Sequence, residues 1–66
     1  MSRTILRLEQ IADRTGIPVA TLRYYRHLGA GGPPTWKLAG RVVSYEDEVD
    51  AWIEEQRIAE QESRSA

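Results

Sequence analysis

The chain has 66 residues and a formal net charge of −1, with 41% hydrophobic and 29% charged residues. A chain of this length forms one small domain and buries only about 60% of the surface that its unfolded form exposes. It has no cysteine and a single histidine, which argues against disulfides and a Cys/His metal site, and it lacks the ~18-residue apolar run of a transmembrane helix.

The N-terminus also lacks the apolar region and cleavage site of a signal peptide. We therefore expect a cytoplasmic protein without cofactors, one domain over residues 1–66. Because neither a disulfide nor a structural metal is available to stabilise the fold, we expect the two tryptophans and three tyrosines to supply much of the core.

Basic and acidic residues are separated along the chain. Residues 1–45 contain seven Arg or Lys and two Asp or Glu, a net charge of +5, whereas residues 46–66 contain two and eight, a net charge of −6. This asymmetry predicts a basic surface that contacts an anionic partner, although the charge of the whole chain is close to zero.

Residues 1–6 are expected to form a loose arm or short strand, with Ile5 and Leu6 as core anchors. A first helix is predicted over residues 8–14, because apolar residues there follow the i, i+3, i+4 spacing of one stripe. That stripe consists of Leu8, Ile11 and Ala12.

A glycine turn and a second helix follow. Gly16 supplies the residue that takes positive φ past a helix end, and Pro18 suits the first turn of a helix over residues 18–28. The inward side of this second helix is expected to consist of Leu22, Tyr25 and Leu28. Helix, turn and helix in this order form the helix-turn-helix pattern.

Residues 36–45 predict a β-hairpin, because apolar and polar residues alternate on both sides of an Ala39-Gly40 turn. The Gly- and Pro-rich residues 29–34 before it are interpreted as a helix cap and turn, since a phosphate-binding loop precedes its helix rather than following it. The apolar face of the hairpin must lie on helices, because two strands alone are marginal.

A third helix is predicted after Ser44, which is assigned as its N-cap, and the acidic residues that follow complement the helix dipole. The stripe of this helix that is expected to face the core consists of Val49, Trp52, Ile53 and Gln56. Trp52 is expected to close the core. The apolar periodicity fades after Ile58, so order is expected over residues 5–58 and fraying over residues 59–66.

The exposed side of the second helix suits duplex DNA, since arginine pairs bidentately with guanine in the major groove and small residues meet the thymine methyl. The predicted DNA-binding residues of this recognition helix are Ala20, Thr21, Arg23, Tyr24, Arg26 and His27. Two alternatives stay open: Tyr24 and Arg26 bind phosphates without reading sequence, or the whole side is an ordinary solvated face.

Lys37 and Arg41 give the hairpin a basic tip. This suits a wing that enters a minor groove, where negative potential attracts arginine, and an ordinary surface hairpin is the alternative. Nothing predicts an enzyme or a metal site: His27 has no histidine or cysteine partner, and the carboxylates of residues 46–55 lie on an exposed helix with no implied pocket.

Two segments, EQIADRTGIPVATLRYYRHLGAGGPP and WKLAGRVVSYEDEVDAWIEEQ, resemble the MerR-like winged-helix domains of bacteriophage excisionases and AlpA-type regulators. The likeness covers about residues 5–57. It is carried by the LRYYR block, the Gly-Pro-Pro segment, the K-x-x-G-R hairpin and the D-x-V-x-x-W-I pattern. Arg7 is a departure, because family members often have a Thr or Ser helix cap there.

The resemblance implies a mainly helical winged helix-turn-helix fold of three helices and a two-stranded wing, with the recognition helix in the major groove and the wing in the minor groove. It implies an excisionase, or recombination directionality factor: copies associate cooperatively on attachment-site DNA, bend it and steer a phage integrase from integration to excision. The alternatives are an AlpA-type transcriptional regulator and a protein-interaction module. The expected setting is the cytoplasm of a bacterial host, with no membrane and no small-molecule substrate.

Overall fold

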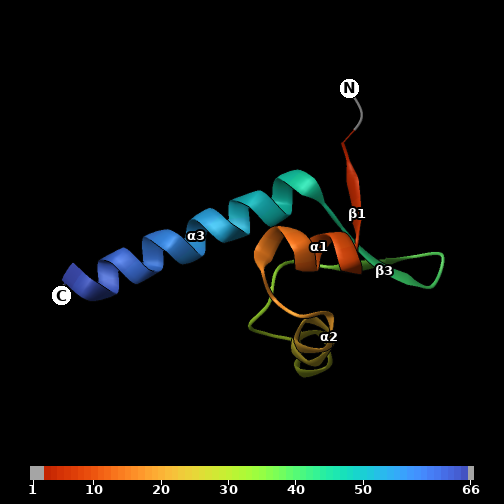
Figure 1. The fold of residues 1–66 in the computed structure, drawn as a ribbon, viewed down its shortest axis with the longest axis horizontal. Coiled ribbons are helices and arrows are strands. Elements are labelled where there is room, and N and C mark those ends of the chain that lie inside the picture. The colour runs from red at the N-terminus through yellow and green to blue at the C-terminus, as the bar shows by residue number, and fades with distance from the viewer. Residues whose placement is uncertain (1–2, 66) are drawn as a thin grey trace.

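The computed structural model describes residues 3–65, which form three helices and three short strands (Figure 1). In chain order these are β1 (Ile5–Arg7), α1 (Leu8–Thr15), α2 (Val19–Leu28), β2 (Trp36–Leu38), β3 (Arg41–Tyr45) and α3 (Glu46–Ser65). The mainly helical fold with a small sheet is the winged-helix-like class that the sequence predicted. None of the helices in residues 3–65 combines the length and apolar character needed to cross a membrane. Met1, Ser2 and Ala66, which belong to the expected arm and tail, lie outside the described residues.

The wing is part of a three-stranded antiparallel sheet in the order β1-β3-β2, whereas the sequence predicted two strands. The N-terminal segment forms the short strand and pairs with β3, so that Leu6 lies opposite Ser44. Ala39 and Gly40 make the predicted two-residue turn, with φ values of 51° and 82°. Positive φ at both positions is the type I′ geometry, whose twist matches that of the flanking strands.

The core is aliphatic, and the prediction that aromatic residues supply much of it is wrong. Its buried cluster consists of Leu6, Leu8, Ile11, Leu22 and Val49. Trp36 and Trp52 are only partly buried, and Val49 rather than Trp52 is the fully buried residue of α3. Branched aliphatic side chains fill the buried space between the elements.

α2 packs through its first half. Leu22 is buried as predicted, and Val19 also packs against the core. Leu28 is 56% exposed, so its predicted inward position is wrong. Leu28 is the last residue of α2, and Gly29, with φ 78°, turns the chain away from the helix. The residues that follow therefore do not cover the Leu28 side chain.

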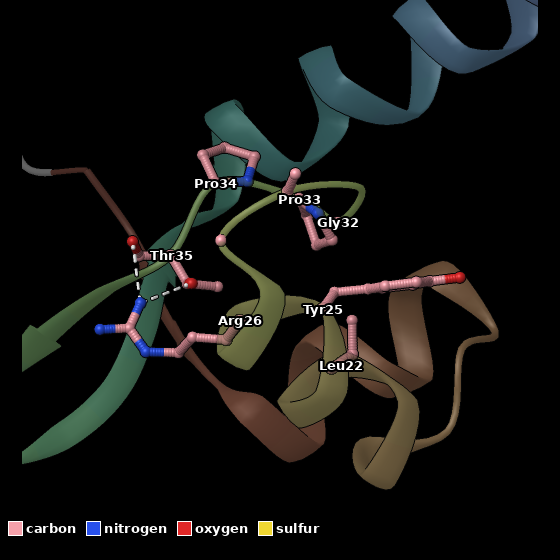
Figure 2. Close-up of a pocket in the computed structure, with 9 residues that line it drawn as sticks. Leu22, Tyr25, Arg26, Gly32, Pro33, Pro34 and Thr35 are labelled. Carbon is pink, nitrogen blue, oxygen red and sulfur yellow. Dashed lines mark hydrogen bonds between the residues drawn. The ribbon is translucent and has the colours of Figure 1, made fainter.

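Tyr25 lies against the loop of residues 29–35 (Figure 2). A Cβ on Gly32 would lie 2.9 Å from the Cβ of Tyr25, closer than two such atoms approach, and therefore only glycine fits there without a shift. Pro33 of the same loop is buried. Tyr25 thus has a packing role, in agreement with its predicted inward position.

α3 begins at Glu46, whose backbone N–H donates to the Thr4 carbonyl oxygen at 2.8 Å. Ser44 is not its N-cap: it lies in β3, fully buried opposite Leu6, because the β1–β3 pairing extends the strand to Tyr45. The helix continues to Ser65 instead of fraying after Ile58. Pairs at i, i+3 and i, i+4, Glu54 with Arg57 and Glu60 with Arg64, support this outer part, which extends away from the other elements in Figure 1.

Candidate nucleic-acid interface

The predicted recognition face of α2 is open to solvent. Thr21 is partly buried, and Tyr24 is 58% exposed. The remaining members of the predicted set are also exposed, namely Ala20, Arg23, Arg26 and His27. Because Leu22 and Val19 hold the other side of the helix on the core, this face is presented outward on a fixed element.

Lys37 and Arg41 are both exposed at the hairpin. Lys37 lies opposite Val42, and Arg41 lies opposite Leu38. Since successive residues of a strand point to opposite faces, these two cations project from opposite faces of the ribbon. They share the wing tip, as predicted, but they do not form one contact surface.

Three arginines from separate elements line one open hollow of about 380 Å³. Arg7 comes from the end of β1, Arg23 from α2 and Arg41 from the start of β3. The rest of the lining consists of Leu8, Glu9, Gly40 and Val42. The fold therefore brings one predicted helix residue and one predicted wing residue together, and it leaves Lys37, Arg26 and His27 outside this hollow.

Arg7 is a candidate contact that the sequence analysis did not select. It occupies the N-cap of α1 with extended backbone (φ −80°, ψ 166°), and a guanidinium has no acceptor for the free helix N–H groups. The Gln10 side-chain oxygen instead accepts from the Arg7 backbone N–H at 2.8 Å, which secures this helix end. The signal in the sequence is a cation at a position where members of the family that the sequence resembles often have a capping Thr or Ser.

Carboxylates of the acidic helix α3 form ion pairs with four of the eight arginines. Arg3 pairs with Asp47 at 3.0 Å and Glu48 at 3.1 Å, and its guanidinium lies 3.8 Å from the centre of the Tyr45 ring. The hydrogen bond from Arg3 lowers the pKa of the Asp47 carboxyl. The remaining partners of α3 are Arg14, with Glu46 at 2.7 Å and Asp50 at 2.8 Å, and its own Arg57 and Arg64.

The other basic residues form no ion pair within residues 3–65, and they are Arg7, Arg23, Arg26, Lys37 and Arg41. All five belong to the N-cap of α1, to α2 or to the hairpin. Exposed ion pairs contribute little to stability, so the main effect of the α3 pairs is on the charge distribution. They neutralise Arg3 and Arg14 and leave unpaired positive charge on the predicted DNA-binding elements.

Arg26 differs from the other unpaired cations, because its guanidinium is turned towards the loop (Figure 2). Its Nη1 donates to the Thr35 hydroxyl oxygen at 2.9 Å and lies 3.4 Å from the Thr35 carbonyl oxygen. His27 is exposed, and no group of three or more His, Cys, Asp or Glu in residues 3–65 is arranged to hold a metal ion.

Comparison of the chain with protein-family models, with curated proteins and with solved structures finds no match. We therefore infer function from the charge and geometry of this chain, together with the resemblance of its motifs.

Proposed function

We propose that the protein binds duplex DNA, with α2 in the major groove and the β2–β3 hairpin in an adjacent minor groove. The observation that carries this proposal is the segregation of charge: the cations left without an ion pair in residues 3–65 lie on the N-cap of α1, on α2 and on the hairpin. Phosphate neutralisation by such cations supplies most of the affinity of nonspecific DNA binding.

The side chains of α2 have the chemistry for direct readout. Arg23 is exposed and unpaired, so its guanidinium is free to pair with guanine, and Ala20 is small enough to meet a thymine methyl. Thr21, Tyr24 and His27 flank them on the same helix. Arg41 at the hairpin is the residue that we assign to the minor groove, with Lys37 on the opposite face of the wing.

We propose that the protein acts through this DNA binding as an excisionase. An excisionase is a recombination directionality factor that bends attachment-site DNA in a bacterial cell. Support comes from the resemblance of the LRYYR, K-x-x-G-R and D-x-V-x-x-W-I motifs to MerR-like excisionases. In this role copies associate cooperatively on DNA and act with a phage integrase, and the protein performs no catalysis. A transcriptional regulator with the same fold is the alternative, since both functions use the same DNA-binding surface.

Titration of a labelled mixed-sequence duplex at several salt concentrations tests the DNA-binding proposal. We expect salt-dependent binding, and Arg41→Ala is expected to lower the slope of log affinity against log salt by up to about 0.9, the value for one lost phosphate contact. Arg64→Ala is the matched control, because Arg64 is ion-paired to Glu60 near the end of α3. Binding that is absent at every salt concentration favours a protein-interaction module instead.

Reconstituted recombination with a cognate integrase then separates the two DNA-binding roles. An excisionase stimulates excision and inhibits integration. A protein that binds the duplex yet changes neither direction is assigned to transcriptional regulation.

A further inference from the structure

The hollow lined by Arg7, Arg23 and Arg41 lies between the two elements that are assigned to DNA grooves. Arg23 lines it from α2 and Arg41 from the start of β3. A helix in the major groove and a wing in the neighbouring minor groove straddle one sugar-phosphate strand, because that strand is the boundary between the two grooves. The strand must therefore pass through the space between α2 and the hairpin.

We propose that this hollow seats a backbone phosphate, that Arg23 and Arg41 contact this phosphate from the edges of the two grooves in place of a base, and that Arg7 is its third arginine contact. The inference rests on the proposed DNA binding and extends it to a site and a residue that the sequence motifs do not indicate. Guanidinium groups suit the ligand, since their N–H groups pair with phosphate oxygens in two-pronged geometry. The ligand class is an esterified phosphate of duplex DNA.

The electrostatics of the lining fit an anion. None of the three guanidiniums has an ion pair within residues 3–65, and each side chain is exposed. Glu9 is the one acid in the lining, which leaves an excess of two positive charges among the lining side chains. Each arginine belongs to a different element, so a phosphate held by all three would fix α1, α2 and the hairpin against the same point of the strand.

The test compares Arg7→Gln with Arg64→Gln, which removes the same charge from a site far along α3. On a mixed-sequence duplex, Arg7→Gln is expected to lower the salt slope by about 0.9 and Arg64→Gln to leave it unchanged. Arg7→Lys keeps the charge but loses the two-pronged geometry, so we expect weaker binding with the slope retained. If Arg7→Gln behaves like Arg64→Gln, the phosphate seat is wrong.

A measurement on the wild-type protein covers the case in which Arg7→Gln fails to fold. We expect the Nε–H NMR signals of Arg7, Arg23 and Arg41 to shift together when the same duplex is added, and the Arg57 signal to stay in place. A shift at Arg23 and Arg41 without one at Arg7 overturns the phosphate seat and leaves the proposed DNA binding intact. Absence of any shift and of salt-dependent binding overturns both.

Discussion

The guanidinium of Arg26 is hydrogen-bonded to Thr35, with its Nη1 2.9 Å from the hydroxyl oxygen and 3.4 Å from the carbonyl oxygen (Figure 2). Arg26 belongs to the last turns of α2, and Thr35 immediately precedes β2, so these bonds span the loop of residues 29–35. They join the helix assigned to the major groove to the residue that leads into the first strand of the wing. Arg26 is thus placed to set the position of the wing relative to α2.

Thr35→Val removes the hydroxyl acceptor with little change in volume. We expect the free energy of unfolding to fall by about 0.5–1.5 kcal/mol, the usual net contribution of one hydrogen bond, as measured by urea denaturation. We also expect weaker duplex binding with an unchanged salt slope, because a less firmly held wing loses pre-organisation but no phosphate contact.

The double variant Arg26→Met/Thr35→Val controls this assignment. If the two residues act through each other, the double variant loses no more than Arg26→Met alone. An Arg26→Met variant that lowers the salt slope by about 0.9, together with a Thr35→Val variant that binds normally, shows that Arg26 contacts phosphate instead.

Local patterns in the sequence predict most of the elements of this fold. The stripe of Leu8 and Ile11 and the positive φ of Gly16 depend only on neighbouring residues, and both are confirmed. The assignment of Ser44 as an N-cap is wrong because its burial depends on the pairing of β3 with β1. Leu6 and Ser44 lie far apart in the sequence, so no local pattern indicates that they pair. The i, i+3 spacing of Glu54 and Arg57 and the i, i+4 spacing of Glu60 and Arg64 are visible in the sequence and favour a helix there, whereas the fading apolar periodicity predicts fraying.

The same distinction applies to the candidate interface. The exposed residues of α2 follow from helical spacing, so Arg23 and Arg26 could be selected from the sequence. The position of Arg7 beside Arg23 and Arg41 depends on how three elements pack, and Arg7 was missed. The pairing of Arg3 and Arg14 with α3 was also invisible, since counting charges along the chain does not show which cations are neutralised in space.

Gly32→Ala tests the packing of the loop on Tyr25. The added Cβ would lie 2.9 Å from the Tyr25 Cβ and 3.1 Å from its Cδ2, so the loop must shift. We expect a loss of about 1–3 kcal/mol in the free energy of unfolding, the usual cost of overpacking, and displaced NMR signals of the Tyr25 ring. Gly16→Ala is the control, because it meets no atom within 4 Å and strains only the backbone at φ 76°. Unchanged stability in Gly32→Ala contradicts this packing.

The pH dependence of stability should report the Arg3–Asp47 contact. The hydrogen bond from Arg3 holds the pKa of Asp47 below its ordinary value of 3.8. A lowered pKa in the folded state means that this contribution is complete above 3.8 and is lost as the pH falls through the folded pKa. We expect the melting temperature to drop as the pH falls below about 3.8, and to drop less steeply in Asp47→Asn. Equal slopes in the two proteins would show that Asp47 contributes nothing.

Glu9→Gln examines the one carboxylate in the lining of the arginine hollow. Removing its charge removes repulsion of a phosphate, worth at most about 1 kcal/mol near 4 Å in water, so duplex affinity should rise by less than about fivefold at low salt. The gain should fade as added salt screens the charge. Glu62→Gln, near the end of α3, is the control.

Stability should move in the opposite direction in Glu9→Gln. Glu9 lies in the first turn of α1, where a negative charge complements the helix dipole, and its loss should cost about 0.3–1 kcal/mol in the free energy of unfolding. Tighter binding by a less stable protein therefore separates repulsion of the phosphate from any general effect on folding. Weaker binding by Glu9→Gln would instead show that the carboxylate accepts a hydrogen bond from DNA, as glutamate does from the amino group of cytosine.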